Sequence, residues 1–312
     1  MTSLANPPAT DTQRNVLVGL IGGGIQLSLT PAMHERAGAL NGLDYAYRLF
    51  DTEMLEPAED LSAMLDKAEQ LGFAGLNIMH PYKQAVIAHL DELSPDASAI
   101  GAVNTVLFRD GKRIGHNTDW FGFAEAFRRD LSDSRCANVV QLGAGGAGSA
   151  VGHALLTLGV ENLSIIDMAP QKAAQLTQAL ARRFPQARVT ALTTPDDAMR
   201  SADGLVNATP IGMAKYAGVP LPTALLRPEM WVVDIIYFPQ ETELLRQARA
   251  LGCRVQNGGG MAVFQAAEAF RLFSGCVADP QRMQDVFTAL CATPAERLIR
   301  RNGWPKQAVS AT

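Results

Sequence analysis

The sequence predicts an α/β protein with two domains, and three observations lead to that prediction. The 312 residues are enough for two domains of ordinary size, each with its own core. Apolar, strand-like runs bounded by Gly, Pro or Asn alternate with amphipathic helical stretches, which is the pattern of βαβ units around a mostly parallel sheet. One of these runs leads into the glycine-rich stretch GAGGAG at residues 143–148, as in doubly wound nucleotide-binding folds.

The first half of the chain alternates three predicted strands with three predicted helices. Pro31 favours a first helical turn, and Gly72 is typical of a helix end. The strands are expected at 16–22, 44–51 and 75–79, and the helices at 30–42, 57–72 and 83–94. This alternation predicts an open, mostly parallel sheet.

The second half begins with one uninterrupted strand, glycine turn, helix and strand over 138–167. Further strands are expected at 203–209, 230–237 and 254–258, a helix at 241–252, and a connecting helix in the centre of the polar segment 116–135. We therefore predict a first domain at 16–118 that is completed by a returning helical segment at 257–296, a second domain at 119–256, and disordered tails at 1–15 and 297–312.

Composition argues against several classes of function. The net charge is −4, so no basic surface indicates nucleic acid, and we expect a small-molecule partner. The four cysteines are scattered, without CxxC pairs or histidine clusters, which predicts free thiols in a reducing cytoplasm and no metal site. Neither a signal peptide nor an apolar run long enough to span a membrane is present, so we expect a cytoplasmic location and no membrane partner.

The glycine stretch satisfies the GxGxxG pattern and has the strand before it and the helix after it that a dinucleotide site requires. Gly143 permits the tight turn, Gly145 lets a pyrophosphate approach the backbone, and Gly148 lets the helix pack against the strand. The helix N-terminus then directs amide groups and its dipole at the phosphates, and the turn is completed by Ala144, Gly146 and Ala147. A plain strand-to-helix turn is the alternative.

Asp167, at the end of the following strand, predicts NAD in preference to NADP. A carboxylate there accepts hydrogen bonds from the adenosine ribose and repels a 2′-phosphate. The next four residues supply no cation to receive that phosphate. An aspartate that caps the next helix would have the same sequence signature.

Lys83 and Asp119 are the candidates for proton transfer. Lys83 follows Pro81 at the carboxyl end of a predicted strand, where open α/β sheets bind ligands, and Asp119 lies at the domain junction. A partly desolvated lysine paired with a carboxylate can exchange a proton with a substrate hydroxyl during hydride transfer. The alternative is a solvated surface lysine.

Over residues 16–289 the chain resembles the shikimate and quinate dehydrogenases. Seven ordered segments carry this resemblance besides the glycine turn: SLTPAMH (28–34), NIMHPYK (77–83), IGAVNT (100–105), GHNTDWFGF (115–123), NATPIGM (207–213), DIIYFPQETELL (234–245) and GGGMAVFQAAEAF (258–270). The resemblance implies a Rossmann-type doubly wound NAD domain and an α/β substrate domain, the latter being the first of the two predicted domains.

The resemblance also implies roles for individual residues. Lys83 and Asp119 would form the catalytic dyad. The substrate carboxylate would be held by Ser28 and Thr30, the substrate hydroxyls by Asn104, Gln265 and Tyr237, and the cofactor also by Asn207, Thr209 and Gly260. Structural alternatives stay open: Ser28 or Thr30 could cap a helix, Asn104 could close a turn, and Gln265 could face solvent. The five histidines are interpreted as structural.

Met79 departs from the family, whose members usually have a threonine there that helps to bind the substrate ring. A thioether cannot replace that hydrogen bond, so we expect Met79 to disfavour shikimate unless its side chain turns into the core.

Thr30 and Asp167 make the chain more similar to the NAD-using, quinate-capable members. We expect a monomer or homodimer that interconverts shikimate or quinate with the 3-dehydro compound. The alternatives are a dehydrogenase of the same fold for another cyclic polyhydroxy or amino ring acid, and a non-catalytic NAD-binding regulator.

Overall fold

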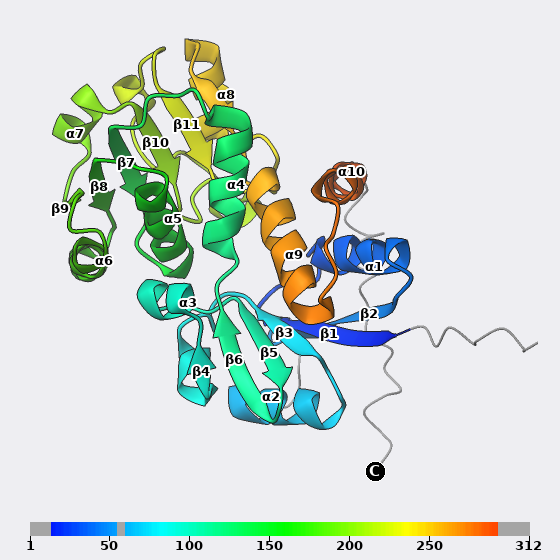
Figure 1. The fold of residues 1–312 in the computed structure, drawn as a ribbon. Helices are drawn as coiled ribbons and strands as arrows, with labels where there is room; N and C mark the ends of the chain where they lie inside the picture. The colour runs from blue at the N-terminus through cyan, green and yellow to red at the C-terminus, as the bar shows by residue number, and fades with distance from the viewer. Residues whose placement is uncertain (1–13, 55–59, 293–312) are drawn as a thin grey trace, which may run out of the picture.

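The computed structural model describes residues 14–54 and 60–292, which contain two six-stranded sheets (Figure 1). The first sheet has the order β2-β1-β3-β5-β6-β4. Its strands are β1 (Asn15–Gly22), β2 (Asp44–Asp51), β3 (Gly75–Ile78), β4 (Glu92–Leu93), β5 (Thr105–Arg109) and β6 (Lys112–His116). β1 lies parallel to β2 and β3, whereas β5 is antiparallel to both β3 and β6.

Helices cover both faces of this sheet because its central strands are apolar on both sides. Val18 and Leu20 of β1 pack with helices α1 (Thr30–Leu40), α9 (Gly259–Ser274) and α10 (Pro280–Cys291), while the alternate residue Ile21 packs with α2 (Leu61–Gln70). Figure 1 shows α2 on one side of the sheet and α1 on the other. The returning segment thus contributes two helices to the core of the first half.

The second sheet is parallel throughout, in the order β12-β11-β10-β7-β8-β9. Its strands are β7 (Asn138–Leu142), β8 (Asn162–Ile166), β9 (Arg188–Leu192), β10 (Gly204–Asn207), β11 (Trp231–Asp234) and β12 (Arg254–Gln256). Its helices are α5 (Gly146–Thr157), α6 (Pro170–Arg183), α7 (Asp196–Ser201) and α8 (Glu243–Leu251). Chain order reverses between β7 and β10, and such a switch point is where doubly wound sheets bind ligands.

Helix α4 (Asp119–Leu131) lies beside α9 where the two halves meet (Figure 1). A Cβ atom on Gly122 of α4 would lie 2.5 Å from the carbonyl oxygen of Met261, and one on Gly260 of α9 would lie 2.9 Å from Cβ of Ala126. Both glycines therefore permit the close approach of these helices. The predicted fold class, with two largely parallel sheets, is confirmed.

The helix predicted at 83–94 is wrong. Only a 3₁₀ turn, η1 (Ala85–His89), forms there, followed by strand β4 and then by helix α3 (Pro95–Ile100). Tertiary pairing overrides the helical pattern, because the backbone amides of Asp91 and Ser94 donate to carbonyls of β6 at 2.9 and 2.8 Å. Ser94 also caps α3 through Ala97 N.

Two further differences concern the first half. The prediction missed the antiparallel pair β5–β6, although its turn, Asp110-Gly111, has positive φ at both residues and is a hairpin signal readable in the sequence. The predicted helix 57–72 appears as α2, and its first three residues lie outside the described part of the chain. The same holds for most of the predicted tail 1–15 and for all of 297–312.

No helix within the described residues has both the length and the apolar character needed to cross a membrane. In the same part of the chain no three His, Cys, Asp or Glu side chains gather as metal ligands would, and the four cysteines are free thiols.

Candidate active site

A cavity of about 200 Å³ lies between the two halves of the molecule. The first half lines it with residues at the carboxyl end of β3 and with Lys83, and the second half lines it with Ala147 and Ile235. Helix α9 contributes Gln265. The cavity therefore joins the end of the first sheet to the glycine turn of the second.

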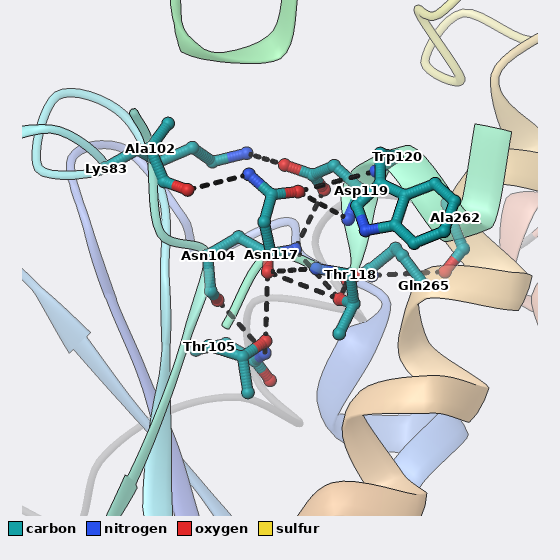
Figure 2. Close-up of polar contacts among 11 residues, drawn as sticks. Lys83, Ala102, Asn104, Thr105, Asn117, Thr118, Asp119, Trp120, Ala262 and Gln265 are labelled. Atoms are coloured by element: carbon teal, nitrogen blue, oxygen red, sulfur yellow. Dashed lines mark hydrogen bonds and ion pairs between the residues drawn. The ribbon is translucent and has the colours of Figure 1, made fainter. Parts of the chain in front are cut away.

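Lys83 and Asp119 meet at this cavity (Figure 2). The Lys83 Nζ lies 2.6 Å from Oδ2 of Asp119, and their side chains are 19% and 8% exposed. Burial on this scale excludes most bulk water, so the pair is not the solvated surface contact of the alternative interpretation. The structure thus brings the two predicted residues together across 36 positions of sequence.

The other oxygen of Asp119 is held by Asn104, whose Nδ2 donates to Oδ1 at 2.9 Å. Asp119 is also the first residue of α4, where the helix dipole favours a negative charge. Asn117 fixes the start of this helix, since its Oδ1 accepts from Asp119 N at 3.0 Å and its Nδ2 donates to the Ala102 carbonyl at 2.9 Å. Sequence reasoning missed Asn117, although it lies next to the conspicuous Asp119.

Four of the predicted substrate residues line the cavity besides Asn104, namely Thr30, Met79, Tyr237 and Gln265. Gln265 lines the cavity, so its side chain does not face only solvent. Its Nε2 donates to the Ala262 carbonyl at 3.1 Å. Burial raises the pKa of the Tyr237 phenol, so this group remains a hydrogen-bond donor at neutral pH.

Ser28 is buried beside the cavity lining, and its Oγ accepts from the backbone amide of Thr30 at 3.3 Å. Neither hydroxyl caps α1, because Leu29 is the N-cap residue and no side chain caps it. The preceding loop is fixed by Asp51 at the end of β2, whose carboxylate accepts from the amides of Gly24 and Ile25 at 2.9 and 3.0 Å. Asp51 is a further residue that sequence reasoning did not identify.

The glycine turn has the stereochemistry that its pattern predicts. Gly143 has φ +98°, which favours glycine, and a Cβ atom on Gly148 would lie 2.3 Å from the Gly143 carbonyl oxygen. A Cβ atom on Gly145 would meet no atom within 4 Å, so the turn is open to a ligand at that residue. Beneath the turn, the buried Gln141 donates from Nε2 to the carbonyls of Gly143 and Gly148, both at 2.8 Å.

The turn lies beside the dyad. A Cβ atom on Gly146 would be 3.6 Å from Cβ of Lys83, and the adjacent Ala147 lines the cavity. A ligand that extends from the α5 N-terminus into the cavity would therefore reach Lys83. These residues fit a dinucleotide, because the N-terminus of α5 offers amide groups and the turn is open at Gly145.

Asp167 ties the end of β8 to the glycine turn. Its Oδ2 accepts from Ala144 N at 2.7 Å, and its Oδ1 accepts from Ala169 N at 2.8 Å. Each carboxylate oxygen retains a second lone pair that can accept from another group. The neighbouring Met168 side chain is 98% exposed and places no cation beside the carboxylate.

The other three predicted cofactor residues differ in position. Asn207 is fully buried and shapes the loop after β10, where it donates to Asp234 and accepts from Thr209 Oγ1 at 2.7 Å. Gly260 lies in the contact between α9 and α4. Gly258, which the prediction did not include, is the glycine of this segment that lines the cavity.

Two of the five histidines, His34 and His153, are buried in structural surroundings. His34 is completely buried among aromatic rings and lies 3.0 Å from the Tyr45 hydroxyl, and desolvation lowers its pKa to about 3. His153 lies between Trp120 and Phe184, and burial lowers its pKa as well. Neither lines the cavity.

Known proteins resemble this chain over nearly its whole length. Residues 20–106 match the family model described as the shikimate dehydrogenase substrate binding domain. The shikimate dehydrogenase (NADP(+)) of Streptomyces avermitilis is 54% identical over 290 residues, which are 92% of this chain and 99% of that protein. The quinate/shikimate dehydrogenase (NAD(+)) of Corynebacterium efficiens is 46% identical over 281 residues, covering 88% and 99%.

A solved structure gives the same result in three dimensions. The quinate dehydrogenase from Corynebacterium glutamicum, in complex with NAD, superposes with a TM-score of 0.85 at 44% sequence identity. The match covers 89% of this chain and all of that one.

Proposed function

This chain belongs to the shikimate dehydrogenase family, and we propose that it is an NAD-dependent enzyme that interconverts quinate or shikimate with the 3-dehydro compound. The observation that carries the proposal is the buried contact between Lys83 and Asp119 at a cavity that also reaches the glycine turn. A binding protein without catalytic activity would have no use for a partly buried ammonium and carboxylate at that point.

The nicotinamide ring, when bound, accepts or gives up the hydride. During reduction the Lys83 ammonium gives a proton to the substrate oxygen, and during oxidation the neutral Lys83 amine takes the proton of the substrate hydroxyl. Asp119 holds the Lys83 side chain in place through the 2.6 Å contact and balances its charge in the cavity. Asn104 and the α4 N-terminus keep Asp119 oriented while the proton moves.

The substrate carboxylate is assigned to Thr30 and Ser28, and the ring hydroxyls to Gln265, Tyr237 and Asn104. The positions of Thr30, Gln265 and Tyr237 in the cavity lining support their assignment. Asn104 also lines the cavity. Both of its amide hydrogens already point at Thr118 and Asp119, so its main interactions are the hydrogen bond to the dyad and those that its side-chain oxygen accepts.

We assign the cofactor to the second half of the molecule, residues 119–256, and the substrate to residues 16–118 together with 257–296. NAD is the proposed cofactor because Asp167 places a negative charge at the end of β8 and Met168 adds no cation. The amides of residues 144–148 and the loop that holds Thr209 would contact the pyrophosphate. The named relatives include users of NADP and of NAD, so this preference rests on Asp167.

The proposal is tested by the rate of NAD and NADP reduction with quinate, shikimate and related ring acids, including an amino-substituted one. Reduction of NAD with quinate or shikimate supports it. Turnover of another ring acid alone would assign a different substrate to the same fold. Tight NAD binding without turnover of any acid in the panel would make the protein a regulator and overturn the proposal.

A further inference from the structure

A chain of buried hydrogen bonds leads from the interior of the first sheet to Asp119, and Figure 2 shows its last part, from Thr105 through Asn104 to Asp119. The Tyr47 hydroxyl donates to Oδ1 of Asn77 at 2.8 Å, and Nδ2 of Asn77 donates to Oγ1 of Thr105 at 3.0 Å. Thr105 Oγ1 donates to Oδ1 of Asn104 at 3.0 Å, and Nδ2 of Asn104 donates to Asp119 at 2.9 Å. Every donor in this chain points toward the carboxylate.

Two backbone groups fix the direction of the chain. The amide of Thr118 donates to the Asn104 side-chain oxygen at 2.7 Å, which assigns the oxygen and nitrogen of that amide. The carbonyl of Asn104 accepts from the Asn77 side chain at 3.3 Å, which assigns the second amide. The Thr105 hydroxyl lies between the two, so it accepts from Asn77 and donates to Asn104.

Water has little access to this chain. Thr105 is 0% exposed, Asn104 4% and Asn77 5%. In such surroundings a hydrogen bond is stronger than in water, neighbouring bonds polarise one another, and an unpaired group is costly. An Asn104 amide rotated by half a turn would direct its oxygen at the Asp119 carboxylate and its nitrogen at the Thr118 amide, and both contacts would be repulsive.

We propose that Thr105, which does not line the cavity, is a positioning residue for the proton-transfer dyad. Its hydroxyl locks the Asn104 amide, and the locked amide holds the Asp119 carboxylate with one oxygen for Asn104 and the other for Lys83. This inference rests on the proposed function of the dyad. It predicts that a hydroxyl outside the cavity controls the rate of proton transfer without touching substrate or cofactor.

The test compares Thr105→Val, which has nearly the same shape and no hydroxyl, with Thr105→Ser, which keeps the hydroxyl. We expect Thr105→Val to lower kcat about tenfold, the usual effect of one buried hydrogen bond. Its pH profile of kcat should move toward higher pH, because an Asn104 amide without the Thr105 hydrogen bond donates less well to the Asp119 carboxylate. KM for NAD should stay within about twofold, since the glycine turn is untouched. Thr105→Ser should restore the rate and the pH profile.

Thermal unfolding of both variants separates this role from a loss of stability. A folded Thr105→Val protein with the wild-type kcat and pH profile would overturn the inference. So would equal losses of activity in the valine and serine variants, since the hydroxyl would then not be the cause. Tyr47→Phe, which removes the first donor of the chain, should shift the same pH profile to a smaller extent.

An outcome in which the wild-type protein oxidises no ring acid with either cofactor would count against the proposed function. The positioning role is then read from the carbon-13 NMR signal of the Asp119 carboxyl group, which reports its hydrogen bonding. That signal should move in Thr105→Val and keep its wild-type position in Thr105→Ser. Identical signals in all three proteins would overturn the inference independently of activity.

Discussion

The role proposed for Lys83 follows from the surroundings of its side chain. Its ammonium is held 2.6 Å from a carboxylate that is itself buried at a helix N-terminus. We expect Lys83→Ala to lower kcat by about 10²-fold or more, the usual effect of losing a general base, with little change in NAD affinity. Initial rates and fluorescence titration with NADH measure the two quantities.

Lys112→Ala is the matched control, because Lys112 also pairs with a carboxylate, Glu92, but is 54% exposed and far from the cavity. The double variant Lys83→Ala, Asp119→Asn should lose much less than the product of the two single losses. Turnover of Lys83→Ala within a few-fold of wild type would contradict the assigned role.

We propose that the choice between NAD and NADP depends on the charge of Asp167 and of the residue beside it. We expect wild-type kcat/KM for NAD to exceed that for NADP by at least about tenfold, which corresponds to about 1.4 kcal/mol. Asp167→Asn would place an amide NH2 group against backbone amides that also donate, and would so disturb the glycine turn. Met168→Arg changes the charge at this place and leaves those hydrogen bonds intact. The added guanidinium can pair with a 2′-phosphate and should raise kcat/KM for NADP about tenfold.

Met168→Gln controls for the loss of the exposed methionine without adding charge. Equal efficiency of the wild type with both cofactors would refute the role of Asp167. No gain with NADP in Met168→Arg would show that the phosphate does not reach this position.

Met79 lines the cavity, although its side chain also contacts the core of the first half. The resemblance to the family implies a threonine at this position, so a substrate hydroxyl facing the thioether would lack a partner, at a cost of roughly 1–3 kcal/mol. We expect Met79→Thr to raise kcat/KM about tenfold for shikimate or quinate. Met79→Leu, which changes shape without adding a hydroxyl, should give no gain. A fall or no change with both acids for Met79→Thr would exclude this explanation.

In the turn between β7 and α5, two positions require glycine for different physical reasons. A side chain at Gly148 would collide with the Gly143 carbonyl at 2.3 Å, whereas one at Gly145 would meet nothing within 4 Å. Gly148→Ala should therefore lower the melting temperature. Gly145→Ala should leave it unchanged and raise KM for NAD at least tenfold, because a methyl group would occupy the surface that a pyrophosphate approaches. An unchanged KM in the folded Gly145→Ala protein would show that the cofactor does not contact the turn there.

The stability of the whole molecule depends on a core that contains a neutral histidine. His34 lies among Tyr45, Tyr47, Phe270 and Phe273, and burial lowers its pKa from 6.5 to about 3. The unfolded chain therefore binds a proton that the folded chain rejects, so stability is lost as pH falls below 6.5. At about pH 5 the loss is about 2 kcal/mol relative to about pH 7.5.

His34→Gln should remove the loss of about 2 kcal/mol in the free energy of unfolding between about pH 7.5 and about pH 5, whatever its effect on stability at neutral pH. Urea unfolding at the two pH values measures it. His116→Gln is the control, because burial lowers the pKa of His116 as well, but that residue is only partly buried. An unaltered difference between the two pH values in His34→Gln would contradict the assignment.

Local patterns in the sequence were sufficient for the fold class and for most elements of the second half. The strand, glycine turn, helix and strand over residues 138–167 depend on contacts between near neighbours, so periodicity and glycine spacing predict them. The same is true of Lys83 and Asp119 as candidates, since each follows from its residue type and its place after a strand or before a helix.

Contacts between segments far apart in the sequence were decided only by the tertiary structure. The segment 83–94 has a helical pattern, but pairing with β6 gives it a 3₁₀ turn and a strand. Gly260 fits a cofactor motif, but it faces a helix more than 120 residues earlier in the chain. Thr105 ends the family segment IGAVNT but received no role from the sequence, yet its hydroxyl connects Asn77 to Asn104. A hydrogen bond between groups far apart in sequence leaves no local pattern, because its geometry exists only after the sheets and helices have packed.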